Sequence, residues 1–290
     1  MQTIKNEKLE VVISPIAAEL KSIRDNDGFE YLWQGDPNYW KRQAINLFPY
    51  IGRLTEGCYS YNGKIFEMER HGFLPNTEMV VEDINDYSIC YLLRDNQKTL
   101  AVYPFLFELR IGYTLSENII NVSYEVKNTG NEPMYFGIGG HPGFRVPLEP
   151  GLSFEDYYLE FADKCFPTRI GMSETCYPNG IDHLYPLKDD KIILLYHELF
   201  DDDAIVLKDM NKKVTLKSDK GKRSVSVMYP DMPYLGFWHT TKSDAPFVCI
   251  EPWTSLPSKD GIIEELTTQP DLICLNPNER YTNMWSIEIR

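Results

Sequence analysis

Three segments of the sequence carry side chains that could exchange protons with a bound ligand. His141 lies in the segment 136–144, where glycines occupy four positions and Pro142 follows the histidine directly. His71 lies in Arg-His-Gly-Phe at 70–73, and Glu251 lies in Cys-Ile-Glu-Pro-Trp at 249–253. Glycines let other atoms approach the backbone closely, which indicates that His141 borders something more than a turn. Imidazole and carboxylate groups together predict general acid and base catalysis on a neutral polyol.

The surroundings of Glu251 support a functional role for its carboxylate. It follows the apolar run 246–250, so we expect it at the end of a strand that borders a cavity. Burial of a carboxylate is costly and raises its pKa, and such a group can act as a general base near neutral pH. Trp238 and Phe144 lie beside the candidate residues and are predicted to stack on the apolar face of a sugar ring. Core packing is the alternative for each aromatic residue.

The segments between these motifs read as strands. Alternating or β-branched runs occupy 9–14, 87–93, 107–115, 119–127 and 204–207. Asp27-Gly28 and Asn62-Gly63 are dipeptides that two-residue hairpins prefer, which favours antiparallel pairing. The best helical candidate is the short stretch 261–266. The sequence therefore predicts an all-β fold of antiparallel sheets, arranged as a single domain over 1–290.

Composition excludes several classes of partner. The 290 residues are 43% apolar and 25% charged, as in soluble globular proteins. The formal net charge of −14 disfavours nucleic acid and anionic membrane surfaces as partners. No signal peptide or run of about 18 apolar residues is visible, so we expect a cytoplasmic protein. The six cysteines contain no Cys-x-x-Cys pair, which indicates free thiols.

Two apparent motifs fail on inspection. Gly-x-Gly-x-x-Gly beginning at Gly137 would require glycine where Pro142 stands, so a dinucleotide site is not expected. The segment His-Glu-Leu-Phe-Asp at 197–201 has Asp201 in place of the second histidine of a zinc protease. His183, His197 and His239 show no spacing of metal ligands and are interpreted as surface or core histidines. The sequence thus predicts neither a metal nor another cofactor.

Four motifs in the order seen here resemble a known family. They are 46–54 (Asn-Leu-Phe-Pro-Tyr-Ile-Gly-Arg-Leu), 70–73, 139–144 and 249–253. In this combination the chain resembles the aldose 1-epimerases, or galactose mutarotases, and most closely the branch associated with lactose operons. The resemblance spans nearly the whole chain. It implies a galactose-mutarotase-like β-supersandwich of antiparallel sheets, an open cleft on the concave sheet, no obligatory cofactor and a sugar as ligand.

The resemblance also implies roles for individual residues. Glu251 matches the general base and His141 the general acid, while His71 matches the second histidine, which holds the ring oxygen and hydroxyls. Arg53 resembles an arginine that lines the pocket. Asp203 is the choice for an acidic residue that binds sugar hydroxyls, with Asp202 as the alternative one position away. Trp253 after the Glu-Pro pair and a short segment after Arg53 depart from the true galactose mutarotases, so the sugar itself stays open.

The activity implied is interconversion of the α and β anomers of a hexose or related sugar. One rival is a non-catalytic carbohydrate-binding or sugar-sensing protein that uses the same cleft. Another is a glycoside hydrolase or polysaccharide lyase, although hydrolysis usually needs two carboxylates beside the scissile bond. The sugar could carry a phosphate, for which Arg145, Arg169 and Lys242 are candidate ligands. The sequence leaves open whether the protein is a monomer or a homodimer.

Overall fold

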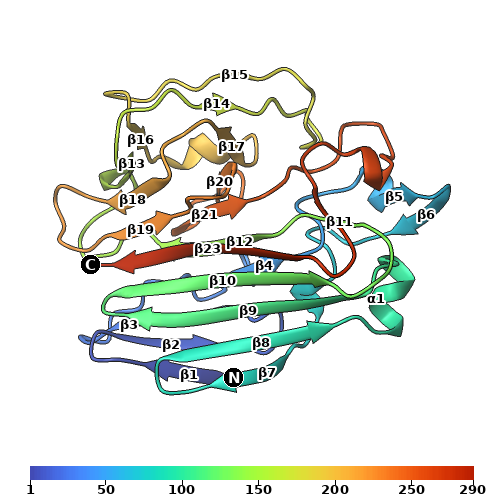
Figure 1. The fold of residues 1–290 in the computed structure, drawn as a ribbon. Coiled ribbons are helices and arrows are strands. Elements are labelled where there is room, and N and C mark those ends of the chain that lie inside the picture. Colours follow the sequence, from blue (N-terminus) through green and yellow to red (C-terminus); the bar gives the residue numbers. More distant parts are fainter.

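A computed structural model describes all residues from 1 to 290. The chain forms five sheets, and every strand pair within them is antiparallel (Figure 1). The predicted all-β fold class is therefore confirmed. Its single α-helix, α1 (Gln97–Val102), is six residues long, and no helix has the length and apolar character needed to cross a membrane.

The largest sheet has nine strands. In spatial order these are β16 (Ile192–Leu194), β13 (Tyr158–Phe161), β18 (Lys213–Lys217), β19 (Val225–Met228), β23 (Arg280–Ile289), β10 (Ile119–Asn128), β9 (Phe107–Ser116), β8 (Ser88–Arg94) and β7 (Val80–Ile84). Along β9 and β10 every second residue is buried, because side chains of a strand alternate between the two faces of a sheet. One face of this sheet therefore packs on the core.

A second sheet has seven strands and carries the predicted catalytic motifs. Its spatial order is β15 (His183–Leu184), β14 (Thr168–Arg169), β17 (Ile205–Lys208), β20 (Tyr234–Trp238), β21 (Phe247–Trp253), β12 (Gly139–Arg145) and β4 (Ala44–Leu47). Every residue of β21 is buried, so both of its faces are covered. One face packs on the nine-stranded sheet, and the other faces the cleft described below.

Three small sheets and five 3₁₀ turns complete the chain. The sheets contain β1 (Gln2–Lys5), β2 (Leu9–Ile13) and β3 (Leu20–Asp25); β11 (Met134–Phe136) and β22 (Ile273–Leu275); and β5 (Cys58–Tyr61) and β6 (Lys64–Glu67). The 3₁₀ turns are η1 (Thr55–Gly57), η2 (Leu74–Asn76), η3 (Phe154–Asp156), η4 (His197–Phe200) and η5 (Leu266–Thr268). Figure 1 shows the β5–β6 hairpin at the same end of the molecule as α1.

A continuous hydrophobic core of 63 buried residues includes side chains from both large sheets. Phe237 of β20 contacts Phe161 of β13 across the interface, with ring centroids 6.4 Å apart. Asn46 of β4 adds a buried polar link: its side-chain oxygen accepts a hydrogen bond from Tyr124 in β10, and its amide lies 2.9 Å from the hydroxyl of Tyr113 in β9. The two sheets are thereby fixed face to face.

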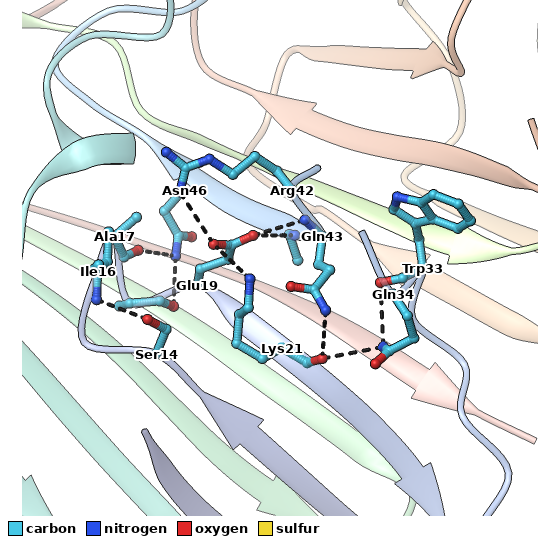
Figure 2. Close-up of polar contacts among 12 residues, drawn as sticks. Ser14, Ile16, Ala17, Glu19, Lys21, Trp33, Gln34, Arg42, Gln43 and Asn46 are labelled. Carbon is cyan, nitrogen blue, oxygen red and sulfur yellow. Dashed lines mark hydrogen bonds and ion pairs between the residues drawn. The ribbon is translucent and has the colours of Figure 1, made fainter. Parts of the chain in front are cut away.

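Polar contacts also tie β4 to the first strands of the chain (Figure 2). The carboxylate of Glu19 is buried and accepts hydrogen bonds from the backbone N–H groups of Gln43 and Ala44. The side chain of Asn46 donates to the carbonyl oxygen of Ala17 at 2.9 Å. Since β4 pairs with β12, these contacts hold the edge of the sheet next to His141.

Local predictions had mixed outcomes. The expected strands are present, and Asn62 and Gly63 form the two-residue turn between β5 and β6 with φ of 50° and 72°. Asp27-Gly28 instead lies in a longer turn after β3, in which the side chain of Asp25 accepts hydrogen bonds from two backbone N–H groups. The helix expected at 261–266 was wrong. The actual helix, α1, begins after Asn96, whose side chain caps two N–H groups.

Candidate active site

Alternation of side chains along β12 and β21 places several candidate residues on the same face of the seven-stranded sheet. His141 points to the outer face of the seven-stranded sheet, as do Glu251 and Trp253 two residues apart on the neighbouring strand. Glu251 lies within β21 rather than at its end, because the strand continues to Trp253. The expected position at a strand end was therefore wrong, although the carboxylate does border a cavity.

This cavity has a volume of about 460 Å³ and collects most of the predicted site residues. Its walls include His71, His141, Glu251, Arg53, Asp202, Asp203 and Trp238. Four buried polar atoms around it have no hydrogen-bonding partner: Nδ1 of His141, Oε2 of Glu251, Oγ1 of Thr240 and Nε1 of Trp253. Buried polar groups are normally paired, so this arrangement suits a polar ligand.

His141 and Glu251 form a close pair at the base of the cavity. Nε2 of His141 lies 3.2 Å from Oε2 of Glu251, and the two residues are only 7% and 1% exposed. Burial lowers the pKa of His141 to about 3 and raises the pKa of Glu251 well above its usual range. Desolvation thus disfavours the charged form of each group: the carboxylate of Glu251 and the imidazolium of His141. We expect the pair to hold one shared proton over a wide pH range.

His71 has a fixed tautomer. Its Nδ1 accepts a hydrogen bond from the backbone N–H of Gly52 at 3.1 Å, so its proton resides on Nε2. Burial, followed by the charges of His141, Arg70 and Arg53, lowers the pKa of His71 well below its usual value. A neutral imidazole with a donor N–H suits hydrogen bonding to a ligand better than it suits proton donation as an acid.

Arg53 and Asp203 meet on one wall of the cavity. Nη2 of Arg53 lies 3.5 Å from Oδ2 of Asp203, and Nη1 donates to the carbonyl oxygen of Thr175. Asp203 has a positive φ of 73° and stands two residues before β17, as expected from the sequence. Asp202 also lines the cavity but forms no ion pair with Arg53. Arg70 adds a second guanidinium to the cavity and has no carboxylate within ion-pair distance.

Phe144 must be removed from the predicted binding residues. It is fully buried in the main core and does not line the cavity. The reason is the two-residue period of a strand: Phe144 is three residues from His141 on β12 and so points to the opposite face. The same period would have selected Trp253, which shares the face of Glu251 and lines the cavity.

Trp40 is a cleft residue that sequence reasoning missed. It lies outside any strand, between β3 and β4, and no motif marks it. Its indole stacks on the imidazole of His141, with ring centroids 4.8 Å apart and planes inclined by 25°. Trp238, predicted from the sequence, lines the cavity as expected, and its ring lies nearly perpendicular to that of His141, with centroids 5.7 Å apart.

The glycines around His141 do permit close approach, but the approaching groups belong to the protein itself. A Cβ atom at Gly139 would lie against the carbonyl oxygen of Pro252 and the ring of Trp253, one at Gly140 against Trp285 on the core side, and one at Gly143 against Trp40. The glycine cluster therefore makes room for indoles on both faces of β12. The glycines shape the cleft by admitting these side chains and not by leaving space for a ligand beside the backbone.

One group in the site could bind a metal. The ligand atoms of His141, Cys249 and Glu251 lie within 4.8 Å of one another, and all three residues are buried. Burial raises the pKa of the Cys249 thiol well above its usual value, which disfavours the thiolate that binds metals. Because His141 and Glu251 are also the predicted acid and base, a metal bound here would compete with proton transfer.

Other candidates lie outside the cavity. Arg145, Arg169 and Lys242, considered as phosphate ligands, do not line it. His183 is exposed on β15. His197 and His239 face one another, with Nδ1 and Nε2 3.3 Å apart, in a cluster next to Phe154. All six cysteines are unpaired.

Comparison of the chain with models of known protein families agrees with the resemblance found in the sequence motifs. A model described as Aldose 1-epimerase matches residues 1–288. The chain belongs to the aldose 1-epimerase family. It is thus an enzyme of the isomerase type.

Individual relatives refine this placement. The plasmid-encoded Protein LacX of Lactococcus lactis subsp. lactis is 37% identical to this epimerase over 267 residues, 87% of each chain. A galactose mutarotase related enzyme from Lactobacillus acidophilus has a TM-score of 0.95 at 34% identity, covering 100% of this chain and 97% of the other. A galactose mutarotase-like protein from Lactobacillus casei ATCC 334 has a TM-score of 0.93 at 30% identity, with both chains fully covered. The branch associated with lactose operons and the galactose-mutarotase-like fold are confirmed.

Proposed function

We propose that this epimerase interconverts the α and β anomers of a hexose, with His141 and Glu251 as the proton-transfer pair. The observation that carries the proposal is the buried contact of 3.2 Å between Nε2 of His141 and Oε2 of Glu251 at the base of a sugar-sized cavity. Mutarotation requires one proton to leave the anomeric hydroxyl and one to reach the ring oxygen. A closely spaced acid and base can serve both atoms of one anomeric centre.

The proposed cycle uses a single proton on the pair. In the reactive form Glu251 is a carboxylate and His141 an imidazolium. Glu251 takes the proton of the anomeric hydroxyl while His141 donates to the ring oxygen, the bond between C1 and that oxygen breaks, and the free aldehyde forms. Both side chains are then neutral, which is the state that burial favours. Rotation about the C1–C2 bond and reversal of both transfers give the other anomer.

The remaining cleft residues bind and orient the sugar in this proposal. Nε2–H of His71 donates a hydrogen bond to a ring or hydroxyl oxygen, because its Nδ1 is already occupied by Gly52. Asp203, held by Arg53, accepts hydrogen bonds from sugar hydroxyls. Trp238 and Trp253 supply aromatic faces for the apolar side of the ring.

The test is an anomer-exchange measurement by NMR or polarimetry on purified variants. Glu251→Gln and His141→Asn should each lower kcat by roughly 10² to 10⁴-fold, because each removes one proton-transfer partner. Matched changes at exposed positions, Glu67→Gln and His183→Asn, should leave kcat unchanged. Near-normal exchange in either cleft variant, with an intact fold by circular dichroism, would refute the assignment.

The same assay separates the rivals and narrows the substrate. A sugar-binding protein without activity would bind hexoses and leave their anomer exchange at the uncatalysed rate. A hydrolase would release new reducing ends from a glycoside. Arg70 is the unpaired cation that a phosphorylated hexose would meet in this cleft. If the sugar is phosphorylated, Arg70→Gln should raise KM for the sugar phosphate more than KM for the free hexose.

A further inference from the structure

The imidazole of His141 lies at one end of a column of stacked aromatic rings. Trp40 covers His141, and the next ring is Phe247, with its centroid 5.8 Å from Trp40 and planes inclined by 24°. Trp33 stacks on Phe247 in turn, at 4.7 Å and 26°. The ring of Trp238 lies nearly perpendicular to those of Trp40 and His141, with centroids 5.7 Å away in each case. The imidazole of His141 is therefore held between the stacked ring of Trp40 and the perpendicular ring of Trp238.

Several contacts hold the loop that carries Trp40 in place. The indole N–H of Trp33 donates to the carbonyl oxygen of Trp40 at 2.7 Å, and the hydroxyl of Tyr39 donates to Oδ1 of Asp244 at 2.7 Å. Gly143 of β12 leaves the space for the indole, since a Cβ atom there would lie 3.1 Å from Cζ3 of Trp40. Trp40 is thus fixed by both the loop and the strand that carries His141.

We propose that Trp40 is a positioning residue for His141: its indole holds the imidazole with Nε2 3.2 Å from Oε2 of Glu251, and its π-face stabilises the imidazolium that donates the proton. This inference rests on the proposed function. A cation over an indole face is attracted by the ring quadrupole, most strongly where water is excluded. His141 meets both conditions, because it is almost fully buried and stacked on Trp40.

The charges around His141 show why such support matters. Glu251, in contact with it, and Asp203 favour the cation, whereas Arg70 opposes it. His71 presents its ring at 5.5 Å and is itself held neutral, and the Cys249 thiol beside the pair is also neutral. Burial disfavours the imidazolium most. Stacking on Trp40 is the contact that stabilises this charge without adding another charged group.

The experiment compares Trp40→Leu, which keeps an apolar cover without a π-face, with Trp40→Phe, which keeps a smaller π-face. Loss of the cation–π contact should lower kcat of the Leu variant roughly 3- to 30-fold with little change in KM, and Phe should restore most of it. Gly143→Ala, whose Cβ atom would displace the indole of Trp40 by a few tenths of an ångström, should lower kcat in the same direction but by less. Phe66→Leu, which removes a ring stacked on Tyr59 outside the cavity, should stay near the normal rate.

A spectroscopic readout in the ligand-free protein makes the test independent of turnover. The ¹⁵N shifts of His141, followed as pH is lowered, report formation of the imidazolium, whose midpoint should move to lower pH in Trp40→Leu and stay near normal in Trp40→Phe. Normal kcat and unchanged ¹⁵N shifts in Trp40→Leu would overturn the inference, and so would equal rises of KM alone in both variants. If His141→Asn were fully active, the proposed function would fail instead, while the ¹⁵N comparison would still report the stacking.

Discussion

At the scale of single residues, the proposed mechanism depends on two neighbouring groups that hold one proton between them. The imidazole of His141 and the carboxylate of Glu251 are both buried, and each loses its charge more readily than it would in water. Neither shift alone would suit catalysis near neutral pH, because a lone histidine would be neutral and a lone glutamate protonated. Together they keep one proton in place, as the proposed cycle requires.

The pH dependence of kcat/KM should show whether His141 and Glu251 hold one proton between them. A second proton joins the pair only as pH falls toward the lowered pKa of His141, about 3, and the shared proton leaves only as pH rises through the raised pKa of Glu251. We expect a broad plateau rather than a narrow bell. In the His141→Asn variant only ionisation of Glu251 is still required, so its residual activity should lack the alkaline limb. In Glu251→Gln only protonation of His141 is still required, so the acid limb should be absent. Limbs at the ordinary pKa values of the two groups would contradict the buried pair.

Metal ions provide a second test at this scale. Chelator treatment should leave activity unchanged, since the proposed proton transfers need no metal. Added Zn²⁺ should inhibit, because it would occupy His141 and Glu251 together with the Cys249 thiolate. Cys249→Ser should weaken that inhibition, which is measured as the zinc concentration that halves the rate. Activity lost to a chelator and restored by a divalent ion would overturn the metal-free mechanism.

At the scale of elements, the two-residue period of β12 separates function from stability. His141 faces the cleft, whereas Gly140 and Phe144 face the core, where Gly140 lies against Trp285 of β23. The mistaken assignment of Phe144 came from proximity in sequence. In a strand, proximity in sequence does not imply the same face.

A substitution at Gly140 should reveal this separation. A Cβ atom there would lie 2.5 Å from the buried ring of Trp285, so Gly140→Ala forces the core to shift. We expect a loss of about 1 to 3 kcal/mol in the free energy of unfolding, as for other overpacked cores. The kcat of the folded variant at 25 °C should stay within about twofold of normal. Denaturant unfolding with a parallel rate assay checks both values, and a large fall in kcat with normal stability would place Gly140 in the site.

At the scale of the whole molecule, stability should depend on histidines that folding keeps neutral. His239 is fully buried, and its Nδ1 donates to the carbonyl oxygen of Thr240 at 2.7 Å. Burial lowers its pKa to about 4. The unfolded chain takes up a proton near pH 6.5, so this contribution is complete above that pH and is lost as pH falls toward 4.

Removal of the titrating group should reduce the acid sensitivity of the fold. Between pH 7 and pH 5, His239 should account for a loss of about 2 kcal/mol in the free energy of unfolding. His239→Asn retains a donor for Thr240 and cannot titrate, so its stability should fall less over the same interval. Urea unfolding at the two pH values measures the difference. Equal losses in both proteins would show that His239 is already hydrated in the folded state.

The sequence alone determined the fold class, the family resemblance and the identity of the acid and base candidates. Local patterns suffice for these, because strand alternation, turn dipeptides and short motifs such as those around His71, His141 and Glu251 lie within a few neighbouring residues. The tertiary structure decided which side chains share a cavity. The stacking of Trp40 on His141, the tautomer of His71 and the exclusion of Phe144 depend on contacts between segments far apart in the chain or on the face of a strand. Such contacts arise only when the sheets pack, so no local pattern could predict them.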